Sequence, residues 1–262
     1  MRRSGASRSL TLTFLASVWR IPRVLRPSPL VRRVAGVWHG SRPTSTSSTT
    51  TESPARDLKR ELLDRALNHV ANLGWSDLAL AQAATDLGLT PMSSTMVSRG
   101  AVELVEHFLG KKREQVSKTM SEMLSTQPPG PPLTQSEILY YAVEAHIDFI
   151  QPIRQTWPTA LALLVSPQNI PHTLVHMEEV TSDLCDFLGI RAARLDWYAE
   201  RGLLSAVYCS TELYLLTDSS ADLQETKDFL RRHIELYNSA RRGDALAAFS
   251  LAFVMTKGWR SA

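Results

Sequence analysis

The sequence predicts an all-α protein with a helix-turn-helix-like head, a larger helical body and a C-terminal amphipathic helix. From Asp57 onward, apolar residues recur at steps of three, four and seven, the spacing of one face of an α-helix. Glycines and prolines separate these stretches and mark the turns between helices. With 262 residues, the chain is long enough for one sizeable hydrophobic core.

Residues 1–51 have the composition of a mitochondrial transit peptide. They contain nine arginines but no lysine and no acidic residue, and they end in a Ser/Thr-rich spacer. A secretory signal is the alternative, because Leu10–Trp19 is apolar. No small-residue cleavage pattern follows that run, and arginines continue beyond it. We therefore predict mitochondrial import, with a mature chain that begins between about residues 40 and 57.

The charge of the chain is unevenly distributed. The whole chain has 29 basic and 26 acidic groups, so removal of the nine leader arginines leaves 20 basic groups and a net charge near −6. Cys185 and Cys209 both lie in apolar helical runs, which favours buried free thiols. No run approaches the roughly twenty apolar residues of a membrane span.

Residues 57–125 form the predicted head. One helix ends at Leu73-Gly74, Ser76 is placed to cap a second, Pro91 begins a short third, and Gly100 precedes a long amphipathic helix over 101–124. This order resembles the head of TetR-type regulators. Residues 91–99 contain only Arg99 as a cation and no bidentate base reader, so we expect no nucleic-acid binding.

Residues 134–240 form the predicted body. A proline-rich linker over 127–132 precedes a capping box made by Thr134 and Glu137, which begins a helix through Ile150. An apolar run follows at 160–165, and residues 167–171 form a turn. Three further helices are predicted over 173–188, 196–216 and 222–242.

Arg201 is the unusual residue of the 196–216 helix. It lies about one turn from both Trp197 and Leu204 on an apolar stripe. A guanidinium does not lose its charge, so burial there requires an anion. Glu212 is eleven residues away, about 16 Å along the axis, and is too distant. The anion is either an acid on a neighbouring helix, such as Asp183 or Glu179, or a bound ligand.

Residues 243–258 form the predicted C-terminal helix. Between Ala245 and Met255 only Ser250 is polar, and cationic residues flank the segment. This pattern suits a helix that lies in a membrane interface. The alternative is a helix docked on its own body or on a second subunit. The residues expected to contact the membrane are Leu246, Phe249, Phe253 and Trp259.

The sequence does not predict an enzyme. It has no HExxH, GxGxxG, GxxxxGK or GxSxG motif. Glu103, Glu106 and His107 come nearest to a metal-binding pattern, but they lie among charged neighbours of one helix. We expect no metal and no cofactor.

Several uncommon residues in fixed order carry a resemblance to a known family. They are Gly74-Trp75, Trp157-Pro158-x-Ala160-Leu161, Asn169-Ile170-Pro171, Asp196-Trp197-Tyr198, Arg201, Thr211-Glu212-Leu213 and Asp218-Ser219-Ser220. On these residues the chain resembles the ubiquinone-biosynthesis accessory proteins, ninth in the coenzyme Q gene series, from Leu62 to Gly258.

The resemblance implies a TetR-like fold that has lost DNA binding. It implies a homodimer on the matrix face of the mitochondrial inner membrane that binds isoprenoid quinone and phospholipid. It also implies a protein partner, the di-iron demethoxyubiquinone hydroxylase. Arg201 falls at the family's phospholipid-contacting arginine, and we expect Leu204 and Tyr208 to contact lipid with it. The residues that fall on the family's partner-facing patch are Leu184, Leu188, Trp197 and Tyr198. A structural adaptor without lipid transfer is the alternative.

Overall fold

The computed structural model describes residues 54–126, 131–190, 195–244 and 250–251, all within the unit formed by residues 51–262. These residues form helices and connecting turns, and no strand occurs among them. The all-α prediction is therefore confirmed. The predicted transit peptide lies outside the described residues.

The head consists of α2 (Pro54–Leu67), α3 (Val70–Leu73), α4 (Asp77–Asp86), the 3₁₀ helix η1 (Pro91–Met96) and the start of α5 (Ala101–Ser125). As predicted, the Ser76 hydroxyl caps α4 by accepting a hydrogen bond from the backbone N–H of Ala79 at 3.4 Å. The Asp77 carboxylate accepts from the backbone N–H of Ala101 at 3.1 Å. These two bonds fix the start of α4 and join it to the start of α5.

The first predicted helix is divided in the structure. The sequence predicts one helix up to Leu73, whereas the structure has a turn at Asn68-His69 between α2 and α3. The His69 ring contacts the Asp86 carboxylate at 2.6 Å, which draws the turn toward α4. Val70 is then buried in the core.

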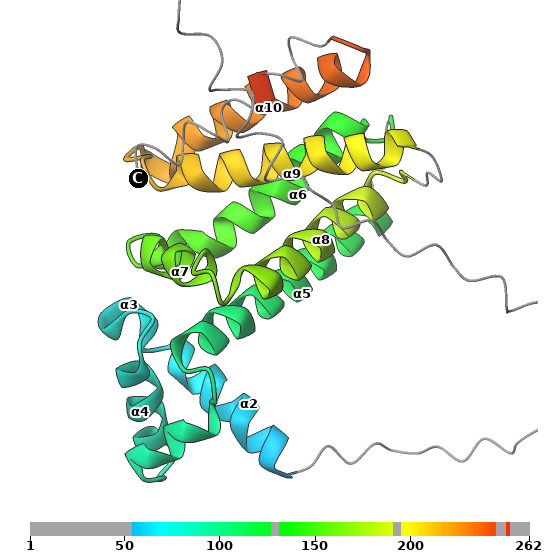
Figure 1. Cartoon of the computed structure of the whole chain (residues 1–262). Helices are drawn as coiled ribbons and strands as arrows, with labels where there is room; N and C mark the ends of the chain where they lie inside the picture. Colours follow the sequence, from blue (N-terminus) through cyan, green and yellow to red (C-terminus); the bar gives the residue numbers. More distant parts are fainter. Residues whose placement is uncertain (1–53, 127–130, 191–194, 245–249, 252–262) are drawn as a thin grey trace, which may run out of the picture. The chain divides into compact units, whose positions relative to one another are not determined.

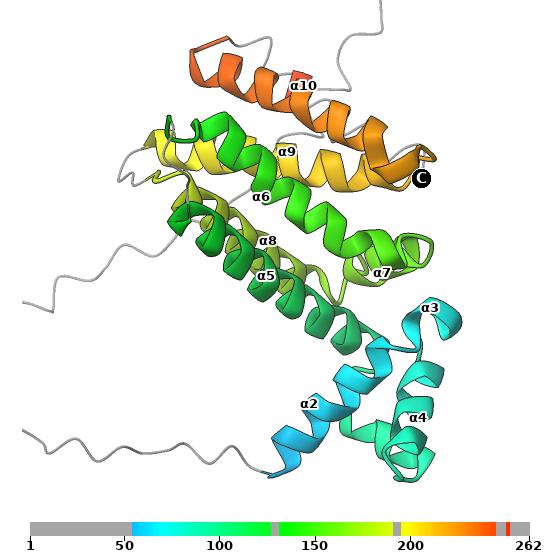
Figure 2. The ribbon, with the colours of Figure 1, turned by 180° about the vertical axis from the view of Figure 1, so that it is seen from behind.

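The body follows α5 in chain order. Its elements are α6 (Gln135–Ile150), η2 (Gln151–Ile153), α7 (Trp157–Leu164), α8 (Ile170–Phe187), α9 (Leu195–Leu215), η3 (Ala221–Leu223) and α10 (Gln224–Arg241). Figures 1 and 2 show α10 beside α9, then α6 and α8, then α5, with α2, α3 and α4 gathered at the N-terminal end of α5. The 25-residue helix α5 therefore belongs to both the head and the body.

An aromatic cluster joins the head to the body. Trp75, which follows α3, lies with its ring centroid 5.4 Å from that of Phe108 on α5 and 5.9 Å from that of Trp157 on α7. Phe108 also lies 5.2 Å from Phe149 on α6. Edge-to-face contacts at these distances add to the free energy of apolar burial.

The predicted helix starts are confirmed at α6 and shifted at α8. The capping box of Thr134 and Glu137 is present. Helix α8 begins at Ile170, three residues earlier than predicted, because Pro171 fits the first turn of a helix and needs no N–H partner there.

Helix α10 begins two residues later than predicted, and Asp218 holds its start. Asp222 and Leu223 have left-handed φ values of 53° and 56°, so the α-helix begins at Gln224. The Asp218 carboxylate accepts hydrogen bonds from the backbone N–H groups of Ser220 at 2.7 Å and Thr226 at 2.8 Å, and from both hydroxyls. Burial raises the pKa of Asp218, but these hydrogen bonds outweigh it and lower the pKa to about 2.

Of the predicted C-terminal segment 243–258, the structure describes only residues 243–244 and 250–251. Leu246, Phe249, Phe253 and Trp259 all lie outside the described residues. Leu251 is helical and fully buried in the hydrophobic core, so at this residue the segment is docked on the body. Within the described ranges, every helix is either too short or too polar to cross a bilayer.

Replacement of Asp218 with alanine tests the cap of α10. We expect the free energy of unfolding to fall by about 1–2 kcal/mol, because the N–H groups at the helix start lose their acceptor. Urea denaturation measures this change. The control is Ser219→Ala on the neighbouring exposed residue, which should be neutral. An equal loss in both variants would show that the Asp218 hydrogen bonds are not responsible.

Candidate functional site

Arg201 lies on α9 at the seam with α8. One guanidinium nitrogen donates to the Glu178 carboxylate at 2.8 Å, the Glu178 carbonyl at 3.0 Å and the Ser182 hydroxyl at 3.0 Å. The guanidinium carbon lies 4.5 Å from the Trp197 ring centroid, a cation–π contact. The Arg201 side chain is 13% exposed, whereas that of Glu178 is 63% exposed.

Of the two alternatives that the sequence left open, the structure shows an acid on a neighbouring helix beside Arg201, and this acid is Glu178 and not Glu179 or Asp183. Glu179 and Asp183 both pair with Arg113 on α5, so neither reaches Arg201. Residues four apart share one face of a helix. Glu178 and Ser182 therefore face α9, while Glu179 and Asp183 face α5 one residue further round the helix.

The predicted partner-facing residues separate into two groups. Trp197 and Tyr198 are in edge contact, with centroids 4.8 Å apart, and Tyr198 is 70% exposed. Leu184 and Leu188 are buried in the core. In the present arrangement of the helices neither leucine reaches the surface, so their contact with a partner stays a prediction.

Leu204 and Tyr208, the predicted lipid contacts beside Arg201, are also buried in the core. The Tyr208 hydroxyl accepts a hydrogen bond from the Lys112 ammonium at 2.8 Å. As the helices stand, neither side chain presents a surface to a ligand.

A buried polar network lies beneath this seam and was not predicted. Lys112 on α5 is fully buried, and its ammonium lies 3.5 Å from the Glu212 carboxylate of α9. The Trp157 indole N–H donates to the same carboxylate at 3.2 Å. Burial lowers the pKa of Lys112, and the nearby Glu212 opposes this shift. A signal was present, since Lys112 stands on the apolar stripe of α5 formed by Val105, Leu109, Val116 and Met120.

Two uncharged histidines accompany Lys112. Burial lowers the pKa of His146 well below its usual value and that of His176 to about 3, and the Lys112 charge acts in the same direction. The His146 ring stands edge-on to Tyr208 at 5.2 Å. Among the described residues, one ring nitrogen of each histidine is buried without a hydrogen-bond partner, and no three His, Cys, Asp or Glu side chains are placed to hold a metal.

A family model described as COQ9 matches residues 170–241, which span α8 to α10. The protein named "Ubiquinone biosynthesis protein COQ9, mitochondrial" of Xenopus tropicalis is 32% identical over 182 residues, covering 68% of this chain and 56% of that protein. The human protein of the same name is 30% identical over 179 residues, with the same coverage. The Drosophila melanogaster protein is 29% identical over 198 residues, covering 75% of this chain and 60% of that protein. The chain thus spans less than two thirds of each relative.

A solved structure supports the predicted TetR-like fold. A TetR transcriptional regulator from Nitrosomonas europaea superposes with a TM-score of 0.54 over 70% of this chain and 98% of that one. The two sequences are 13% identical, so the likeness concerns the fold alone.

His176 should make the protein sensitive to acid. The unfolded histidine binds a proton near pH 6.5, whereas the folded one does so only near pH 3, so stability is present above pH 6.5 and is lost as the pH falls toward 3. We expect His176→Leu to reduce the slope of unfolding free energy against pH, between pH 6.5 and 4.5, by up to about 1.4 kcal/mol per unit. Urea denaturation across that range measures it. His172→Leu, on an exposed residue of the same helix, should leave the slope unchanged, and an equal effect of both would contradict the assignment.

Proposed function

The chain belongs to the COQ9 family, and on that premise we propose that it acts in ubiquinone biosynthesis as a lipid-binding protein. It binds an isoprenoid quinone intermediate or a phospholipid and presents the precursor to the demethoxyubiquinone hydroxylase. The observation that carries this proposal is the environment of Arg201. Its guanidinium is mostly buried, and its counter-ion is an exposed carboxylate.

The Glu178 contact is of a kind that a lipid can replace. The hydrogen bonds from Arg201 to Glu178 and Ser182 all use one terminal nitrogen of the guanidinium. Arginine has five N–H donors and binds phosphate through two parallel hydrogen bonds. An ion pair with an exposed carboxylate contributes about 0–1 kcal/mol. A lipid phosphate can therefore displace Glu178 at small cost.

The apolar part of the lipid needs a path into the body. Besides the Arg201 hydrogen bonds, the seam between α8 and α9 includes contacts from Thr181 to Ser205 at 2.8 Å and from Cys209 to Met177 at 3.9 Å. Separation of the two helices at this seam would uncover Leu204 and Tyr208, which lie below Arg201 on α9. We propose these as the first apolar surface that the lipid tail meets.

The hydroxylase would dock beside the same site. Tyr198 is a large exposed aromatic residue next to Trp197, and aromatic residues dominate the binding energy of many interfaces. In this proposal the segment 243–258 contacts the matrix face of the mitochondrial inner membrane through Leu246, Phe249, Phe253 and Trp259. The protein is proposed to be a homodimer and to act without a metal, a cofactor or nucleic acid.

A structural adaptor without lipid transfer is the second candidate. The closed Arg201–Glu178 pair and the buried state of Leu204 and Tyr208 favour it. In the adaptor, Arg201 only joins α9 to α8, and Tyr198 still binds the hydroxylase.

Native mass spectrometry of the gently extracted protein distinguishes the two candidates. For lipid delivery we expect co-purified quinone or phospholipid, reduced at least about tenfold in Arg201→Gln because the headgroup loses its charge-assisted hydrogen bonds. Glu178→Gln removes the competing anion and should keep or increase the lipid. The matched control is Arg231→Gln, an arginine on α10 that likewise lies over an aromatic ring, that of Tyr140, and pairs with a carboxylate. Lipid-free wild-type protein would support the adaptor.

Tyr198→Ala tests the docking surface. Loss of an exposed anchor should weaken hydroxylase binding by about 2 kcal/mol, which is roughly thirtyfold in Kd. The melting temperature should not change, because Tyr198 contributes little to the core. Surface plasmon resonance measures the affinity, with Tyr141→Ala on α6 as the control for a partly exposed tyrosine. Equal affinity of the wild type and Tyr198→Ala would remove Tyr198 from the interface.

A further inference from the structure

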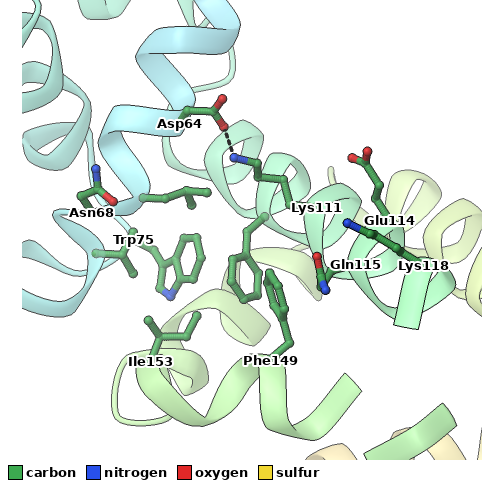
Figure 3. Close-up of a pocket in the computed structure, with 12 residues that line it drawn as sticks. Asp64, Asn68, Trp75, Lys111, Glu114, Gln115, Lys118, Phe149 and Ile153 are labelled. Carbon is green, nitrogen blue, oxygen red and sulfur yellow. Dashed lines mark hydrogen bonds and ion pairs between the residues drawn. The ribbon is translucent and has the colours of Figure 1, made fainter. Parts of the chain in front are cut away.

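A pocket lies at the junction of the head and the body, lined by residues other than those of the proposed lipid site. It has a volume of about 500 Å³ and is lined by α2, α3, Trp75, α5, α6 and η2. This volume is within the range of small-molecule sites. Figure 3 shows Asn68 and Trp75 on one side, Phe149 and Ile153 below, and Lys111, Glu114, Gln115 and Lys118 along α5.

The floor of this pocket is aromatic. Trp75, Phe108 and Phe149 line it, and Phe108 lies 5.4 Å from Trp75 and 5.2 Å from Phe149 between ring centroids. Apolar side chains of α2, α3 and η2 complete the floor. A surface made of ring faces and edges favours a flat aromatic ring, which can add a stacked or edge contact to its own apolar burial.

The rim of the pocket carries charged and polar side chains. The Lys111 ammonium donates to Asp64 at 2.5 Å, so its charge is already balanced. Lys118, about two turns further along α5, has no ion pair among the described residues. In Figure 3 the Glu114 carboxylate points away from the aromatic floor. Asn68 and Gln115 add side-chain amides to the rim.

Trp75 adds a buried donor without an acceptor. Its side chain is 4% exposed, and its indole N–H has no hydrogen-bond partner in the part of the chain that the structure describes. An unsatisfied buried donor costs about 1–3 kcal/mol. A ligand oxygen that reached this N–H would remove that cost.

We propose that this pocket binds a planar aromatic anion, such as an aromatic carboxylate. The ring lies on Trp75, Phe108 and Phe149, and the anionic group lies toward Lys118 and Gln115 on α5. Arg201 does not line this pocket, so the test of this proposal is independent of the test of lipid delivery.

Isothermal titration calorimetry of the full chain with two probes tests the proposal. 2-Naphthoate is the anion, and 2-naphthylmethanol is its uncharged counterpart of similar shape. We expect saturable binding of 2-naphthoate that is about fivefold or more tighter than that of the alcohol, because only the anion pairs with Lys118. Lys118→Gln should bring the two affinities within about twofold. Lys227→Gln on α10, outside the pocket lining, should change neither.

The location is tested by filling the pocket. Gln115 is exposed, so Gln115→Trp should fold normally and abolish 2-naphthoate binding, whereas Gln82→Trp on the exposed surface of α4 should not. The indole N–H signal of Trp75, assigned by Trp75→Phe, should shift on binding. Arg201→Gln should bind 2-naphthoate as the wild type does. Absence of saturable binding, equal affinity for both probes in the wild type, or binding that survives Gln115→Trp would overturn the proposal.

Discussion

The buried ion pair between Lys112 and Glu212 is the constraint on which the arrangement of the body depends. A fully buried ammonium is stable only beside a counter-charge and hydrogen-bond acceptors, and here Glu212 and Tyr208 supply them. Glu212 must therefore point inward, and this fixes the rotation of α9 about its axis. Arg201 is eleven residues before Glu212, almost a whole number of turns, so it lies on the same stripe about 16 Å away. The inward turn of Glu212 thus also places Arg201 at the seam with α8.

The two cations of the body, Lys112 on α5 and Arg201 on α9, differ in how strongly they are held by their partners. Removal of one partner from a buried pair leaves an uncompensated charge in the core and costs about 3–5 kcal/mol. Lys112 therefore stays beside Glu212 as long as both side chains are buried in this core. Arg201 is paired with a carboxylate that is mostly in solvent, and such a pair contributes about 1 kcal/mol or less. Of the two, only Arg201 is free to exchange its partner for a ligand, and for this reason the proposed lipid site is placed at Arg201.

The local features of the fold could be predicted from the sequence, and the features that depend on helix rotation could not. The caps at Ser76 and Thr134 are set by residues within one turn, so their patterns were sufficient. The partner of Arg201 depends on the rotation of α8 about its own axis. A rotation that moves the helix surface by one residue decides whether Glu178 or Glu179 faces Arg201. The same rotation places Leu184 in the core. Lys112 was missed because a single charged residue on an apolar stripe does not reveal which helix supplies its counter-ion.

Packing against the body holds the head in place, and this packing does not use the residues that would contact DNA. Trp75 lies between Phe108 of α5 and Trp157 of α7, so the turn after α3 is part of the core shared with the body. Removal of the head would expose these rings and cost a substantial part of the apolar burial. In contrast, η1, at the position of a recognition helix, has no buried residue, and Arg99, the cation that follows it, pairs with Glu106. Packing therefore preserves the shape of the head and the aromatic floor of its pocket, while nothing in this packing preserves a basic DNA-binding surface.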